Sequence, residues 1–196
     1  SERLGELSTK FSNNVLDATN KWHLILDNKS QVKGLPERVL ELMALSAQRH
    51  LKKEGDFDSQ NGPWKLSLDI PTYTAFMSYA EDSSLREKLY KAFVSRASEG
   101  DENNSQIIEE ILSLRTKQAK LLGYDSWADL SLSTKMAGKI NSVEKLLEEL
   151  REPSFKAAEL ELENLNNFAN KNGFNDDNQL KPWDISYWSE LLRKEK

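Results

Sequence analysis

Apolar residues recur at intervals of three and four along most of this chain, and this spacing constrains the fold more than any other feature. Leu4, Leu7 and Phe11 begin the pattern, and they share one face of a helix because an α-helix turns once in about 3.6 residues. The pattern predicts helices over about 1–18, 36–53, 71–80, 84–98, 104–122, 125–130, 141–152, 154–172 and 184–196. We therefore expect a mainly α protein.

Two short segments break the helical spacing. KWHLIL at 21–26 is rich in aromatic and β-branched residues, and WKLSLDI at 64–70 alternates Trp64, Leu66, Leu68 and Ile70 on one face. Both compositions favour strands, and the two segments are expected to pair. The predicted fold is an irregular multi-helix array with one short two-stranded β element.

Local signals predict where several helices begin and end. Ser84 with Glu87 and Asn141 with Glu144 have the spacing of capping boxes, which satisfy free amides at a helix start. Pro153 cannot donate a backbone hydrogen bond, so it should break or kink the helix around it.

The final stretch, KPWDISYWSELLRKEK at 181–196, starts like a helix but shows no stop signal. Pro182 and Trp183 lead into Asp184, whose carboxylate can cap a helix start. A Gly or Asn should mark the end, yet charged residues continue to Lys196. We expect a helical domain at 1–182, followed at 183–196 by the truncated start of a further helical segment.

Charge excludes one class of partner. The net charge is -5 and the isoelectric point is near 5.3, whereas nucleic-acid-binding proteins usually carry a basic surface. Lys52-Lys53 and Arg193-Lys194 are short enough to be solvated faces. No nucleic-acid partner is expected.

Composition also limits compartment and chemistry. The chain has no cysteine, which excludes disulfides, thiolate zinc sites and cysteine nucleophiles. Its apolar runs are far shorter than the roughly 18 residues that cross a bilayer, and its first residues do not resemble a signal peptide. We expect a soluble protein without a membrane partner, located in the cytoplasm, or in an organelle stroma or matrix if a transit peptide has been removed.

No catalytic or metal site is predicted from the residues themselves. His23 and His50 are the two histidines, they fall on different elements, and neither belongs to an H-E-x-x-H motif. The pairs Glu109-Glu110 and Glu148-Glu149 lie on helices, where neighbouring side chains diverge by about 100 degrees, so a solvated face is the better interpretation than an acid/base pair. A nucleophile elbow and a Gly-rich phosphate loop are both missing.

Two arginines stand in apolar stripes and are candidate structural residues. Arg115 lies four residues after Ile111, and Arg86 lies between Leu85 and Leu89. A cation in such a position needs a carboxylate or carbonyl partner, so both are predicted to join helices. Gly123 should supply the left-handed turn that ends the helix before it. A cluster of aromatic residues is interpreted as core, with a peptide-binding groove as the less favoured alternative: Tyr73, Phe76, Tyr79, Tyr90 and Phe93.

Several stretches resemble, in order, the thimet oligopeptidase family and its oligopeptidase A branch. The most specific are R-x-x-x-A-x-L-L-G-Y from Arg115 to Tyr124, the trio KMA at 135–137 and the turn PWD at 182–184. Longer matching stretches are FSNNVLDATNKW, GLPERV, LSLDIPTYTAFMSYAEDSSLREKLYKAFVSRAS, ILSLRTKQAKLLGYDSWADLSLSTKMA and LKPWDISYW. Together they cover most of the chain.

The resemblance implies a mostly helical zinc peptidase in which a deep channel admits short peptides. In that family an H-E-x-x-H helix and a later glutamate hold zinc, and those residues are not in this sequence. The resemblance therefore implies a non-catalytic N-terminal or middle portion that supplies channel wall and scaffold, is inactive alone, and carries no catalytic residue, metal ligand or cofactor of its own. Zinc is expected in the full-length parent enzyme.

Two other interpretations stay open. The chain is alternatively a stand-alone helical module that binds a peptide or a protein and has kept the fold without zinc chemistry. The other interpretation is self-association of the chain through the surface that would otherwise contact the missing catalytic lobe, because exposed apolar residues promote association.

Overall fold

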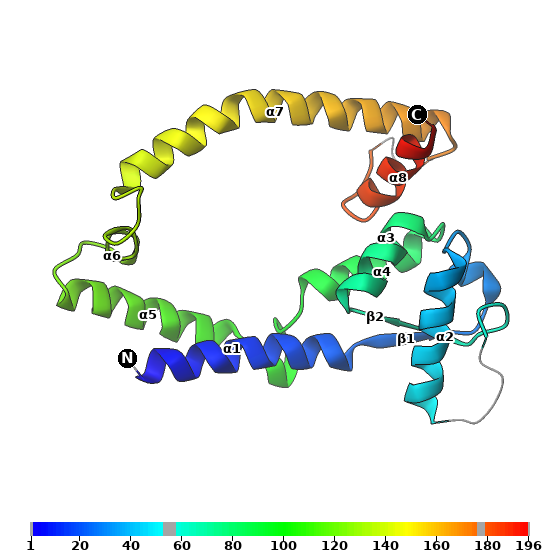
Figure 1. Ribbon diagram of the computed structural model, residues 1–196, viewed down its shortest axis with the longest axis horizontal. Helices are drawn as coiled ribbons and strands as arrows, with labels where there is room; N and C mark the ends of the chain where they lie inside the picture. The colour runs from blue at the N-terminus through cyan, green and yellow to red at the C-terminus, as the bar shows by residue number, and fades with distance from the viewer. Residues whose placement is uncertain (1, 53–57, 176–178, 196) are drawn as a thin grey trace. The chain divides into compact units, whose positions relative to one another are not determined.

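The computed structural model describes residues 2–52, 58–175 and 179–195. Within these ranges the chain is mainly α-helical with one two-stranded antiparallel sheet (Figure 1), as the sequence predicts. The helices are α1 (Glu2–Lys21), α2 (Glu37–Leu51), α3 (Ile70–Tyr79), α4 (Ser83–Val94), α5 (Ser105–Leu121), α6 (Trp127–Leu132), α7 (Ile140–Lys171) and α8 (Ile185–Glu195). The strands are β1 (His23–Leu26) and β2 (Trp64–Ser67), and the 3-10 turns are η1 (Lys29–Val32) and η2 (Gly100–Glu102).

The elements form two compact units. The first, which we call the α5 unit, contains residues 1–15 and 97–163. The second, the sheet unit, contains residues 16–96 and 164–196. The division of the chain at 182/183 stays a prediction.

The sheet unit is built around the β1–β2 pair. The strands are antiparallel, with His23 opposite Ser67 and Leu26 opposite Trp64, so the predicted pairing is confirmed. Alternation puts Trp64 and Leu66 on one face, where both are buried, and α2 packs against β2. The segment 54–63, whose composition predicts a loop, falls partly outside the described residues.

Helices α3 and α4 extend the same core. Phe76 of α3 is fully buried, and Tyr73 stacks on Phe93 of α4 with ring centroids 4.0 Å apart. Tyr79 and Tyr90 pack half-buried against this core. The core interpretation of the aromatic cluster is confirmed.

Helix α8 packs on the last turns of α7 within the sheet unit. Trp188 lies with Leu165 and Ala169 in a small apolar cluster, and the rings of Phe168 and Phe174 meet it edge-on. Helix α8 also contacts α3. Of the apolar stripe that the spacing predicts for 154–172, Leu165 and Ala169 are buried, whereas Phe155, Ala158 and Leu162 are exposed.

The α5 unit joins the first half of α1 to α5. Leu7 packs with Ile107 and Ile111, and Arg3 forms a two-pronged ion pair with Glu110 at 2.8 and 3.0 Å. The spacing predicts an α5 stripe of Ile108, Ile111, Leu112, Ala119 and Leu122. Ile111 and Ala119 are buried as predicted, but Ile108, Leu112 and Leu122 are exposed and Ile107 is buried instead. The helix turns its Ile107–Ile111 edge toward α1, which periodicity alone does not specify.

Three further expectations about helix ends and stripes need correction. Helix α4 starts at Ser83 and is capped by Asp82, which accepts from the Leu85 amide at 3.0 Å, in place of a Ser84–Glu87 box. Asp82 wins because it precedes Ser84 and its carboxylate also accepts from the Ser84 hydroxyl. Helix α7 starts at Ile140, so Asn141 lies inside it and does not cap it. The apolar spacing at 141–152 predicts a buried stripe at the start of α7, but its members Leu146, Leu147 and Leu150 are exposed.

Pro153 does not end α7. The helix is assigned without interruption from Ile140 to Lys171. A proline removes one backbone hydrogen bond and clashes with the carbonyl four residues earlier, but the turns on both sides keep their own bonds. The helix therefore continues through the proline, so the predicted break is wrong, and the alternative of a kink stays a prediction.

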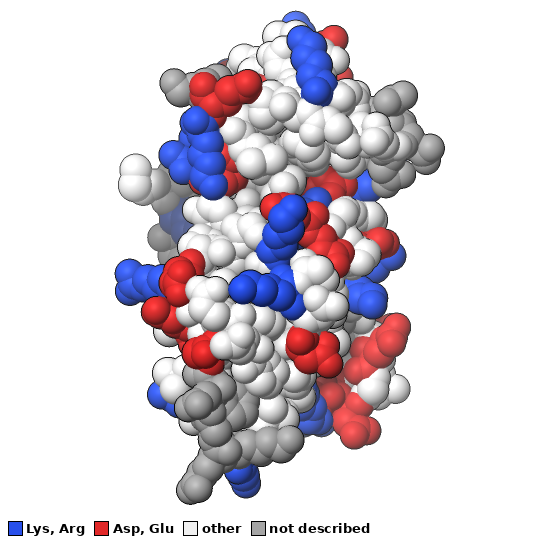
Figure 2. All heavy atoms as spheres, turned by 90° about the vertical axis from the view of Figure 1, so that its right-hand side faces the viewer, with Lys and Arg blue, Asp and Glu red and all other residues white. Residues whose placement is uncertain are grey.

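Surface charge and helix hydropathy bear on the excluded partners. On the face drawn in Figure 2, acidic and basic side chains are interspersed and form no basic stripe. Among the described helices, none is both long and apolar enough to cross a bilayer.

Candidate functional site

A buried arginine lies at the centre of a polar site in the sheet unit. Arg86 of α4 is only 2% exposed. Its Nη2 donates to Asp184 at 2.7 Å, its Nε donates to the Trp183 carbonyl at 3.0 Å, and its Nη1 donates to the Ala80 carbonyl at 2.6 Å. The expected carboxylate and carbonyl partners are thus both present. The guanidinium joins the end of α3, the start of α4 and the start of α8.

The partner carboxylate is equally buried and equally satisfied. Asp184 is 1% exposed, and it also accepts from the Ser83 hydroxyl at 3.0 Å and the Lys181 amide at 3.2 Å. These bonds correct the expectation that its carboxylate caps α8. The carboxylate turns inward because a buried guanidinium offers a stronger, charge-assisted hydrogen bond than a solvated amide. We call this group of Arg86, Asp184 and their carbonyl partners the arginine staple.

The turn before α8, residues 182–184, supplies the Trp183 carbonyl and the Asp184 carboxylate that bind Arg86. Pro182 is exposed, and the Asp184 amide donates to the Lys181 carbonyl at 2.9 Å, which closes the turn. The Trp183 ring is half-buried, with the Tyr90 ring centroid 6.0 Å away. Trp183 and Asp184 of this turn therefore connect the start of α8 to α4.

Arg115 differs from Arg86 although both lie at similar places in the sequence pattern. It is half-buried, and its guanidinium carbon lies 5.3 Å from the centre of the Trp127 ring of α6. Gly123, with φ of 80°, provides the left-handed turn between α5 and α6. Within the part of the chain that the structure describes, Arg115 forms no ion pair, so a cation–π contact replaces the expected carboxylate.

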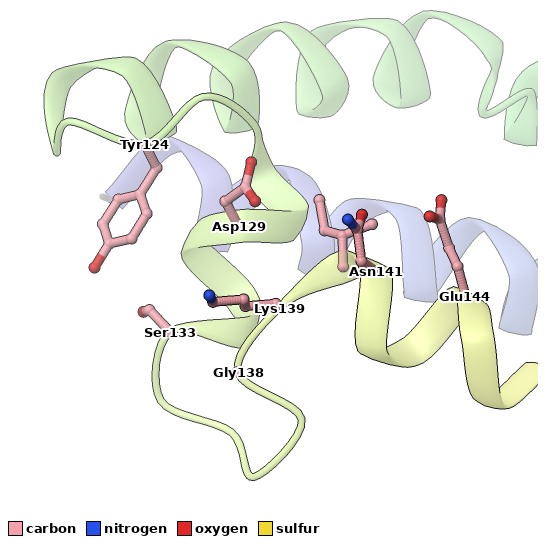
Figure 3. A pocket seen from close by; sticks show the side chains of 8 residues that line it. Tyr124, Asp129, Ser133, Gly138, Lys139, Asn141 and Glu144 are labelled. Atoms are coloured by element: carbon pink, nitrogen blue, oxygen red, sulfur yellow. The ribbon is translucent and has the colours of Figure 1, made fainter.

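A polar hollow lies where α6 is followed by α7. It has a volume of about 520 Å³ and is lined in part by Tyr124, Asp129, Ser133 and Lys139, which Figure 3 shows around it. Asp129 is engaged by the Ser126 hydroxyl at 2.7 Å as part of the α6 cap. The hollow offers hydrogen-bonding groups but no nucleophile in contact with a base.

The two histidines come together in space, which the sequence did not reveal. The ring centroids of His23 in β1 and His50 in α2 are 4.1 Å apart. Lys65 of β2 lies 3.5 Å from His50 Nδ1. Burial of the ring, Lys65 and His23 together lower the pKa of His50. The signal that could have found this contact is the strand pairing, since Lys65 and His23 stand on facing strands.

These residues do not suit a metal ion. The described residues contain no group of three or more His, Cys, Asp or Glu side chains that could hold one. The histidine pair supplies two ligands, and the Lys65 ammonium beside it opposes a cation.

At least one glutamate of each adjacent pair forms a surface ion pair. The hydrogen bond from Arg3 holds the pKa of Glu110 below its ordinary value, and Arg151 does the same for the pKa of Glu148. A general acid needs a raised pKa, so neither carboxylate is prepared for that role. The interpretation as solvated helix faces fits their positions.

Fold and site together define a mainly helical protein whose sheet unit is held together by a buried ion pair. A family profile described as "Peptidase family M3" matches residues 76–196. The chain belongs to this peptidase family, which agrees with the oligopeptidase resemblance of its sequence.

Individual relatives extend the match to the whole chain. It is 42% identical over 195 residues to the organellar oligopeptidase A, chloroplastic/mitochondrial, of Arabidopsis thaliana, and 43% identical to the probable cytosolic oligopeptidase A of that plant. It is 41% identical to oligopeptidase A of Escherichia coli, over 98% of this chain. The chain spans only 24% to 27% of the length of these relatives.

Proposed function

We propose that this chain is a non-catalytic helical portion of an oligopeptidase A-like zinc metalloendopeptidase that hydrolyses short peptides. The observation that supports it most is the identity of about 40% to oligopeptidase A proteins over 98% to 100% of the chain. An identity spread over the whole chain favours a retained role within the same kind of enzyme. The cytosol, or an organelle stroma or matrix, is the compartment we propose, by analogy with the two plant relatives.

The role we propose for the chain is structural. The arginine staple holds α3, α4 and α8 together with buried charge-assisted bonds, and the described residues offer no metal ligand group. A rigid helical wall restricts which substrates reach a distant centre through its shape alone. Zinc and the groups that activate water would come from the rest of the peptidase.

A hybrid enzyme tests the proposal. This chain replaces the matching segment of Escherichia coli oligopeptidase A, and cleavage of a short internally quenched peptide is measured with and without a chelator. We expect the hybrid to cleave the peptide, the chelator to abolish cleavage, and the isolated chain to be inactive and to bind no stoichiometric zinc. A folded hybrid without activity, or chelator-sensitive cleavage by the isolated chain, would refute the proposal.

A further inference from the structure

An apolar groove runs between α1 and α5, which lie side by side in Figure 1. It has a volume of about 320 Å³, and Phe11, Ile111 and Leu112 are among its lining residues. The hydroxyl-bearing side chains of α1 and the guanidinium of Arg115 supply the polar part of the lining. The groove thus combines an apolar floor with a single cation.

Large apolar side chains at this groove face solvent. Ile108 is 44% exposed and Leu112 is 56% exposed. The neighbouring Ile107 and Ile111, one position earlier in each case, are buried against α1. Helix α5 is therefore apolar on two adjacent edges, and α1 covers just one of them. Such a helix usually buries its second apolar edge against another element.

The cation of the groove lacks a counter-charge of its own. No carboxylate is among the groove's lining residues, and Arg115 forms no ion pair among the described residues. Elsewhere along the same helix pair, Arg3 donates hydrogen bonds to both carboxylate oxygens of Glu110. The α1–α5 contact supplies a carboxylate to one arginine and leaves the other to be complemented from outside.

We propose that this groove seats a segment from the remaining three-quarters of the oligopeptidase polypeptide. That segment places an apolar side chain against Phe11 and Leu112 and an Asp or Glu carboxylate on Arg115. The inference rests on the proposed function, because the chain spans about a quarter of its relatives' length. A second copy binding through the same groove would bring no carboxylate from that groove. A transient peptide would leave Ile108 and Leu112 in water for most of the time.

Site-directed photo-crosslinking tests the occupant. Leu112 is replaced by p-benzoylphenylalanine in the hybrid enzyme described above, the sample is irradiated, and crosslinked peptides are identified by mass spectrometry. We expect an intramolecular crosslink to a segment outside the 196 residues that carries an acidic residue. Glu109, three positions earlier on α5 and outside the groove lining, is the matched control and should give no crosslink to that segment. A crosslink confined to this chain, to a second molecule, or to added substrate peptide overturns the proposal.

A charge reversal checks the carboxylate. Arg115→Glu should lower the melting temperature of the hybrid, and converting the crosslinked acidic residue to Lys should restore it, whereas Arg115→Lys should have a smaller effect. Rescue by the second reversal is not expected if Arg115 acts solely through the Trp127 ring. A double variant no more stable than Arg115→Glu contradicts the proposal.

The outcomes separate this inference from the proposed function, because crosslinking needs no activity. A hybrid that cleaves peptides but crosslinks elsewhere refutes the groove proposal alone. A hybrid that crosslinks as expected but cleaves nothing refutes the proposed function alone. If the hybrid does not fold, the isolated photoreactive chain is irradiated with overlapping peptides that tile the rest of the Escherichia coli enzyme, and capture of none of them overturns the groove proposal.

Discussion

Replacing Asp184 by Asn should destabilise the sheet unit strongly. The substitution keeps the size of the side chain but leaves the Arg86 guanidinium, 2% exposed, without its counter-ion. Breaking a buried ion pair by removing one partner costs about 3–5 kcal/mol. The whole stability of a domain is only about 5–15 kcal/mol. The variant should therefore lose a large fraction of its stability.

Replacing the arginine tests the same reasoning from the other side. Arg86→Met leaves the Asp184 carboxylate buried and also removes the donor from the Ala80 and Trp183 carbonyls. Each unsatisfied buried carbonyl costs about 1–3 kcal/mol. The double variant Arg86→Met, Asp184→Asn should cost clearly less than the sum of the two single variants, because each single variant leaves a charge that the double variant removes.

Urea unfolding followed by tryptophan fluorescence measures the change in stability of the sheet unit. Four of the five tryptophans lie in the sheet unit, and the remaining one is Trp127. A Trp127→Phe background therefore makes the signal specific to the sheet unit. The matched control is Glu81→Gln, which breaks an exposed ion pair with Lys33 in the same unit. Its midpoint should change little, because solvent screens exposed ion pairs.

Two results would show that the reasoning is wrong. One is a loss below about 1 kcal/mol for Asp184→Asn, the range of exposed pairs. The other is additivity of the two single variants, which would mean that Arg86 and Asp184 do not stabilise each other.

Three further predictions concern pH, backbone and helix continuity. The pKa of His50 is lowered in the folded protein by desolvation, Lys65 and His23. Stability should therefore fall as pH drops below the ordinary histidine pKa of about 6.5. The urea midpoints at pH 7.5 and pH 5.5 should differ less in the His50→Gln variant than in the unchanged protein. Gly34→Ala should destabilise the protein by more than the about 1–2 kcal/mol of left-handed backbone, because the new Cβ would lie 2.3 Å from the Tyr79 carbonyl oxygen. Gly123→Ala is the control, since its Cβ would meet no neighbour. Equal decreases in melting temperature for the two variants would contradict this. Pro153→Ala should stabilise α7 by up to about 3 kcal/mol, seen as slower amide exchange around residue 153, and unchanged exchange would argue against it.

Much of the fold follows from local pattern. Strand pairing was predictable because Trp64 and Leu66 alternate with polar residues, so a single face could be buried. The turn at Gly123 was predictable because left-handed backbone favours glycine strongly. Each of these signals lies within a few consecutive residues, so it can be found in the sequence alone.

The errors have other causes. The α5 stripe was predicted at Ile108 and Leu112, but the neighbouring Ile107 edge faces α1. A helix with two apolar edges can bury either one, and the choice depends on a partner more than 90 residues away in the chain. The break predicted at Pro153 is wrong for a local reason, because the one hydrogen bond that a proline removes does not outweigh the bonds of the turns around it.

For the candidate site, too, some features follow from the sequence and others only from the tertiary structure. The sequence by itself determined that the chain is mainly helical, that it belongs with oligopeptidase A-like proteins, and that Arg86 in an apolar stripe needs a polar partner. Only the tertiary structure decided that the partner is Asp184, 98 positions away, and that Arg115 finds an aromatic ring instead. The physical reason is that burial and ion pairing depend on which distant elements meet, and periodicity records only the need for a partner and not which residue fills it.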